Sequence, residues 1–184
     1  MAPARLHTPA PRARTMIHPG PFNPVRIQSQ HATHGRHIRL ALAPGQSLYD
    51  GLVKPLAALG ITSASMTILG GYAERLDYCV APPDPSKRAL IAYSTPIPLG
   101  RTYIIFGNAT LGFDPQGKPL VHCHAAMRTD TGTVQGGHII TEETIIGPWP
   151  IPVLVTSLEG FELRQIYDPE INISVLKPLR EPMI

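Results

Sequence analysis

Apolar and polar residues alternate in short runs along most of the chain from His37 onwards. Alternation with a period of two places every second side chain on the same face of a strand. Together with frequent β-branched and aromatic residues, it predicts strands over 37–42, 64–69, 73–80, 88–93, 102–113, 119–128, 133–140, 152–158 and 172–178. Turn-forming residues such as Asp114-Pro115-Gln116-Gly117 lie between these runs. We therefore expect a largely antiparallel sheet.

One segment has helical rather than strand periodicity. After the first strand, leucines recur at helical spacing: Leu48, Leu52, Leu56 and Leu59. Ser47 is suited to cap the helix N-terminus, with Asp50 near its positive end, and Gly60 is suited to end it. Pro55 conflicts with this prediction, because proline removes a backbone hydrogen bond to Gly51 and should kink or divide the helix.

These elements predict an α+β domain, with a central, mainly antiparallel sheet and one or two flanking helices. The chain of 184 residues is long enough for one ordinary domain. We expect a disordered, basic, proline-rich arm over residues 1–35, the domain over 36–179 and a short tail over 180–184. Translation begins at either Met1 or Met16, since both precede the predicted domain.

The positive charge is concentrated in the predicted arm. The formal net charge is +3, yet residues 1–39 hold six arginines and no acidic residue. The remainder therefore holds 10 basic and 13 acidic residues, a net charge of −3. A domain of this sign lacks the electrostatic footprint of a duplex-binding protein, so the predicted domain itself does not favour DNA as a partner.

Targeting and cysteine usage favour a cytoplasmic protein. No apolar run approaches the roughly 20 residues needed to cross a bilayer, and the N-terminus has no apolar block typical of a secretory signal. Cys79 and Cys123 are the only cysteines, too few for a disulfide framework. We find no Ser-His-Asp order, phosphate-binding glycine loop or nucleotide fingerprint.

Three of the eight histidines lie within one predicted hairpin, in the segment HCHAAMRTDTGTVQGGH. Asp130-Thr131-Gly132 fits a three-residue loop in which glycine takes the left-handed position. In that register His124 lies directly opposite His138, with Cβ atoms roughly 4.5–5.5 Å apart. His122 is two residues along the same strand, so all three imidazoles share one face.

Three neutral imidazoles with an open fourth position are typical of a catalytic metal site, for zinc or another first-row divalent metal. Gly136 and Gly137 remove side-chain bulk beside the third histidine, so that another backbone or a bound ligand can approach closely. Cys123 points to the opposite face in this register, where we expect a core thiol rather than a ligand.

Other interpretations of these residues stay open. The histidines also fit a polar network in a subunit interface or an anion pocket. Glu142 and Glu143 follow the third histidine, where one could act as a general base or orient a ligand. Such a pair is more often a solvated strand end.

The segment HCHAAMRTDTGTVQGGHI resembles the signature of the plant and prokaryote conserved (PPC) domain, which accompanies AT-hook motifs in plant nuclear proteins. The resemblance extends over residues 37–178 and includes the TILGG strand end. It implies an α+β fold, assembly as a homotrimer and a metal bound through His122, His124 and His138. Many prokaryotic relatives are labelled as candidate DNA-binding proteins. The Arg-Gly-Arg core of an AT-hook is absent from this sequence, which argues against minor-groove binding.

Three functions follow from these observations. The first is a trimeric metal-binding protein that acts on or binds a small molecule, by hydrolase, lyase or isomerase chemistry if it is an enzyme. The second is a DNA-associated or regulatory protein that uses its basic arm. The third is a scaffolding trimer in which the histidines only join subunits or sense pH.

Overall fold

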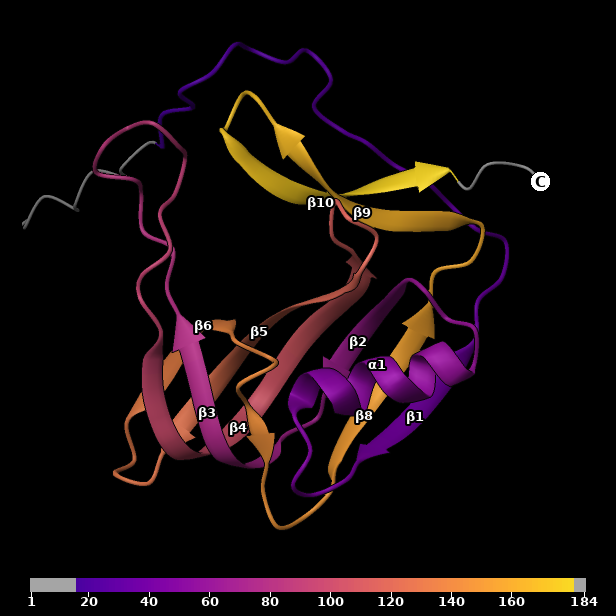
Figure 1. Ribbon diagram of the computed structural model, residues 1–184, viewed down its shortest axis with the longest axis vertical. Coiled ribbons are helices and arrows are strands. Elements are labelled where there is room, and N and C mark those ends of the chain that lie inside the picture. Colours follow the sequence, from indigo (N-terminus) through magenta and orange to yellow (C-terminus); the bar gives the residue numbers. More distant parts are fainter. Residues whose placement is uncertain (1–15, 181–184) are drawn as a thin grey trace, which may run out of the picture.

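The fold is a computed structural model that describes residues 16–180, so the predicted arm is described only from Met16 and residues 181–184 lie outside the description. Within this range the chain forms one helix and ten strands (Figure 1). They are β1 (His37–Leu42), α1 (Leu48–Ala58), β2 (Ala64–Ile68), β3 (Gly71–Cys79), β4 (Ile97–Phe113), β5 (Pro119–Thr129), β6 (Val134–Ile139), β7 (Ile145–Ile146), β8 (Ile151–Ser157), β9 (Phe161–Asp168) and β10 (Ile173–Arg180).

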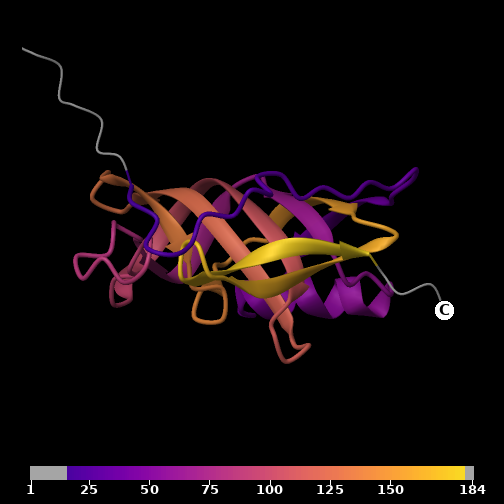
Figure 2. The same ribbon diagram turned by 90° about the horizontal axis from the view of Figure 1, so that it is seen from above.

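The strands form one sheet in the order β1-β8-β2-β4-β5-β6-β3-β7. All of these neighbours pair antiparallel, as the sequence predicts. The exception within the described residues is a short parallel contact in which Phe113 of β4 pairs with Arg164 of β9. The β9–β10 hairpin extends from this point, and Figures 1 and 2 show it as the yellow pair of strands beside the main sheet.

The helix agrees closely with its prediction. The Ser47 hydroxyl accepts the backbone N–H of Asp50 at 3.0 Å, and Gly60 takes a positive φ of 68° just after the helix. Pro55 lies inside the helix without dividing it. The predicted apolar face is wrong at Leu59, which is the C-terminal capping residue and is 48% exposed.

The core lies between α1 and the face of the sheet that it covers. Three leucines of the helix are fully buried and belong to one apolar cluster with alternate residues of the central strands. Because the aromatic content is only 6%, this core is mainly aliphatic. Its largest fully buried side chains include Leu48, Leu52, Leu56, Met66, Ile68, Ile104, Met127, Ile139 and Ile151.

The predicted strand at residues 88–93 is wrong. The region from Val80 to Pro96 forms a loop with a single isolated bridge between Pro83 and Ile91. The Asp84 carboxylate organises this loop by accepting the backbone N–H groups of Ser86, Arg88 and Ala89. These local bonds hold the chain in a turn. The strand predicted from the sequence would instead require pairing with a neighbouring strand.

Residues 16–35 form neither helix nor strand, yet part of this segment is attached to the β9–β10 hairpin. Glu170, in the turn of that hairpin, is 5% exposed. Both oxygens of its carboxylate accept hydrogen bonds from Nη1 of Arg26 at 2.8 Å. The carboxylate also bonds to Nδ1 of His18 at 2.7 Å and accepts the backbone N–H of Asn23 at 2.9 Å. The predicted arm is therefore attached to this hairpin through His18, Asn23 and Arg26.

Residues 16–180 contain no helix that could cross a membrane. Their one helix has 11 residues, which is too short to span a bilayer.

Candidate metal centre

The hairpin between β5 and β6 has the register that the sequence predicts. The backbone N–H of Thr129 donates to the carbonyl of Thr133 at 3.0 Å, and the N–H of Gly132 donates to Thr129 at 2.9 Å. Gly132 takes a positive φ of 85°, the conformation that glycine adopts most readily. His124 consequently pairs directly with His138.

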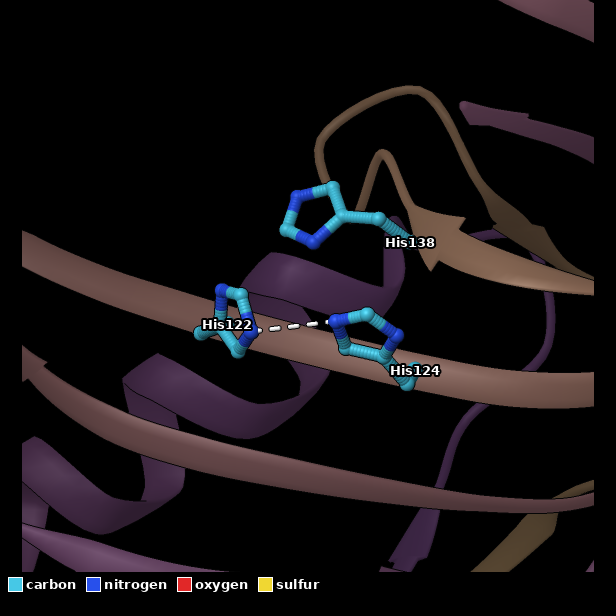
Figure 3. A group of neighbouring side chains, drawn as sticks. All are labelled: His122, His124 and His138. Carbon is cyan, nitrogen blue, oxygen red and sulfur yellow. Dashed lines mark hydrogen bonds between the residues drawn. The ribbon is translucent and has the colours of Figure 1, made fainter. Parts of the chain in front are cut away.

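The three imidazole rings face one another across a shared space, as Figure 3 shows. Nε2 of His124 lies 3.1 Å from Nε2 of His122, and one ring nitrogen from each of the three residues lies within 4.8 Å of the others. Two nitrogens bound to a tetrahedral zinc at ~2.05 Å would be ~3.3 Å apart. The spacing of His122 and His124 is thus close to that of a metal-bound pair, and a ring nitrogen of His138 lies within 4.8 Å of both.

Burial prepares two of these rings to act as neutral ligands. Desolvation and the neighbouring imidazoles lower the pKa of His138 to about 4, and desolvation with His124 lowers the pKa of His122. Both rings are therefore uncharged at neutral pH, the form that coordinates metals. Nδ1 of His138 is buried and has no hydrogen-bond partner among the described residues. An orphaned ring nitrogen beside two other imidazoles fits a metal ligand better than a closed hydrogen-bond network.

Cys123 lies between the two histidines of β5 but faces the other side of the sheet. Its side chain is fully buried in the apolar core, and burial raises the pKa of the thiol to about 12. A thiol that stays protonated and points away from the imidazoles is not a ligand of this site, as the strand register predicts.

The two glycines before His138 differ in their surroundings. A Cβ on Gly137 would lie 2.6 Å from Cδ2 of Tyr78 and 2.7 Å from the carbonyl oxygen of Cys79. Gly137 therefore allows β6 to approach β3, which pairs with it at Cys79 and His138. The nearest atom to a Cβ on Gly136 is 3.5 Å away, so this position has ordinary room. A role of either glycine in binding a cofactor stays a prediction.

The two glutamates that follow β6 lie in different places. Glu142 lines a cavity together with His122 and His138. Glu143 instead forms an ion pair with Arg75 at 3.1 Å. The structure brings only Glu142 to the neighbourhood of the histidines, and a catalytic role for it stays a prediction.

Two neighbouring cavities flank His122. The larger, of about 550 Å³, also borders His124, and the smaller, of about 280 Å³, borders His138. Both are also lined by Tyr93 and Gln165. The Tyr93 ring lies 5.4 Å from the His138 ring between centroids, tilted by 56°.

Sequence reasoning did not find Tyr93 or Gln165. Tyr93 comes from the loop after β3, which the sequence pattern wrongly predicted as a strand, and Gln165 comes from β9, which the pattern did not predict. Neither residue stands next to a histidine in the sequence, so no local motif links them to the site.

The sequence of residues 29–158 matches the family model of the Plants and Prokaryotes Conserved (PCC) domain. The match includes the whole histidine hairpin and ends before β9. The family resemblance inferred from that hairpin is thereby confirmed. No curated protein matches the chain in sequence.

Solved structures share the fold at low sequence identity. A metal-containing protein from Archaeoglobus fulgidus superposes with a TM-score of 0.63 at 18% identity, covering 82% of this chain and 98% of its own. A plant- and prokaryote-conserved protein from Pyrococcus horikoshii gives 0.61 at 18% identity, with coverages of 84% and 99%. A candidate DNA-binding protein from Ralstonia eutropha JMP134 gives 0.61 at 20% identity, with coverages of 80% and 93%.

Proposed function

Because this chain belongs to the Plants and Prokaryotes Conserved domain family, we propose that it binds a divalent metal, zinc in the first instance, through His122, His124 and His138. The observation that carries the proposal is the convergence of the three rings, with one nitrogen of each within 4.8 Å of the others. The metal content named for the similar structure from Archaeoglobus fulgidus supports it.

The same geometry leads us to propose a small-molecule function. A metal held by three histidines, with a fourth position open, can polarise a carbonyl or lower the pKa of a water molecule. The protein contributes the half-buried imidazoles of His122 and His138, which stay neutral. It also contributes two cavities beside His122, in which a ligand would be oriented. If the protein is an enzyme, hydrolysis, elimination and isomerisation all fit this arrangement.

Metal binding is tested on protein purified without a histidine tag. Elemental analysis should find about one metal ion per chain, as a single three-histidine site requires. Substitution His124→Ala should reduce metal binding at least tenfold in a cobalt titration followed by visible absorption. His37→Ala is the matched control, because His37 lies on β1, bonds to Thr156 and should bind metal as the parent does. Equal metal content in parent protein and His124→Ala would refute the site.

We also propose the homotrimer that the family resemblance implies. Light scattering coupled to size-exclusion chromatography should give about three times the chain mass of 20.0 kDa. A monomer at micromolar concentration would refute this assembly.

A second candidate function is DNA binding through the N-terminal arm. The candidate DNA-binding protein from Ralstonia eutropha favours it. Ion pairing weakens it, because Arg26, the one arginine in the described part of the arm, contacts Glu170 and is partly neutralised. The remaining arginines before Arg26 lie outside the described residues.

Deleting residues 1–15 separates the two functions. If DNA binding depends on the arm, the deletion should abolish retention on duplex DNA at low salt and leave metal content unchanged. Retention that survives the deletion would locate any DNA binding on residues 16–184.

A further inference from the structure

The larger cavity beside the histidines is mainly apolar. Six of its eleven lining residues are aliphatic, and they come from the loop after β3, from β5 and from β10: Ala81, Ile91, Leu120, Ile173, Val175 and Leu176. The volume of about 550 Å³ lies within the usual range for small-molecule pockets. Because His122 and His124 form one wall, a molecule in this space would have an apolar body beside a metal-binding end.

The charges around the site narrow the chemistry further. No lysine or arginine lines either cavity among the described residues, and the one acidic residue is Glu142. Sites that bind phosphate or several carboxylates depend on arginine, lysine or exposed backbone N–H groups. The uncharged polar groups are the amide of Gln165 and the hydroxyls of Tyr93 and Ser174, which can form a few hydrogen bonds with a ligand. These walls do not suit a nucleotide or another polyanion.

The C-terminal hairpin supplies much of the apolar wall. Residues 173–176 of β10 and Gln165 of β9 line the larger cavity. The hairpin is fixed against the loop after β3, because the N–H of Leu90 donates to the carbonyl of Ile171 at 2.9 Å and the Asn172 side chain donates to the carbonyl of Arg88. This loop also carries Ile91 and Tyr93, so two segments that fix each other form one side of the cavity.

We infer that the site takes a small molecule with an apolar body and one oxygen-bearing metal-binding group, and that the β9–β10 hairpin selects it. The inference rests on the proposed metal site, to which it adds the class of ligand. The metal-binding group lies at the histidines, the apolar body lies against Ile173 and Val175, and Gln165 is positioned to bond to a polar atom beside them.

The test uses zinc-loaded protein and two probes that share one metal-binding group. Calorimetry should show octanohydroxamic acid binding at least tenfold more tightly than acetohydroxamic acid, because only the longer probe can bury an alkyl chain in the cavity. Equal affinities would overturn the inference while leaving the metal site in place. Tighter binding of adenosine monophosphate than of octanohydroxamic acid would also overturn it.

A matched pair of variants assigns the effect to the hairpin. Val175→Asp places a carboxylate in the apolar wall, so it should abolish the preference for the longer probe while metal content and acetohydroxamic acid binding stay unchanged. Val134→Asp makes the same change at a 62% exposed position of β6 and should keep the preference. If Val175→Asp does not fold, Val175→Ala should reduce the preference at least twofold. If both Val175 variants keep the parent's preference for the longer probe, the role of the hairpin is overturned. If the parent protein does not retain zinc, the proposed function is refuted instead.

Discussion

Gly137 directly precedes His138 and lies where β6 packs against β3. Its missing side chain lets β6 lie against Tyr78 and Cys79 of β3. The neighbouring glycine has no such contact, although the two are adjacent in the sequence. The pair therefore offers a direct comparison between a glycine required by packing and one that is not.

Substitution Gly137→Ala should destabilise the fold by about 1–3 kcal/mol, because one of the atoms its Cβ would meet is the backbone oxygen of Cys79. The accompanying shift of β6 should also move His138 and weaken zinc binding severalfold. Denaturant unfolding and a zinc competition assay measure the two effects. Gly136→Ala is the control and should change neither, since its nearest neighbour is 3.5 Å away. Equal losses in both variants would contradict this role of Gly137.

At the residue level, the sequence was sufficient to predict the three-histidine cluster. A hairpin has few possible registers, and the loop containing Gly132 selects one of them. Once that register is fixed, His122, His124 and His138 must share a face. Tyr93 and Gln165 were out of reach, because tertiary contacts between distant segments bring them to the site.

Among the elements, α1 carries the clearest local sequence signals. Ser47 satisfies one backbone donor of the first turn, and three leucines bury one face. Its cap and its apolar stripe both lie within a dozen consecutive residues, so the sequence predicted its start and end.

Substitution Ser47→Ala should lower the free energy of unfolding by about 1 kcal/mol, because the N–H of Asp50 loses its acceptor. Thermal or denaturant unfolding would measure the change. Ser65→Ala serves as the control on an exposed position of β2 and should be nearly neutral. A Ser47 variant as stable as the parent would show that the cap contributes nothing.

The elements that the sequence missed depend on distant partners. β9 has few fully buried positions, so the alternation that marks a strand is weak there. It forms because β10 pairs along its whole length. Residues 88–93 show the reverse case, since a strand-like composition is overridden by the hydrogen bonds of Asp84.

For the molecule as a whole, Glu170 joins the first described segment to the last hairpin. Its bonds to His18, Arg26 and Asn23 lower the pKa of its carboxyl to about 2, from an ordinary value of 4.5. A depressed pKa means that the charged form is favoured in the folded state. The stabilisation is therefore complete above about pH 4.5 and is lost as the pH falls towards about 2.

The backbone amides of Gly20 and Asn23, which donate to Glu170, should consequently be protected at neutral pH and be released on acidification through this range. Hydrogen exchange of these amides, measured between pH 6 and pH 2 and corrected for the intrinsic rates, should show the loss of protection ahead of the main sheet. Glu170→Gln should show it already at neutral pH. Glu162→Gln, which removes an ion pair within β9, is the control and should leave these residues protected. Protection that is unchanged in Glu170→Gln would refute the attachment.

The attachment at Glu170 has a counterpart farther along the hairpin, where Arg180 donates to the side chain of Gln30. Chain ends are commonly the first parts of a domain to fray. In this protein the outermost described segments secure each other, so fraying of either one removes support from both. Truncations or fusions at one end should therefore loosen the segment at the other end. They should also loosen the hydrophobic wall that the C-terminal hairpin presents to the histidines.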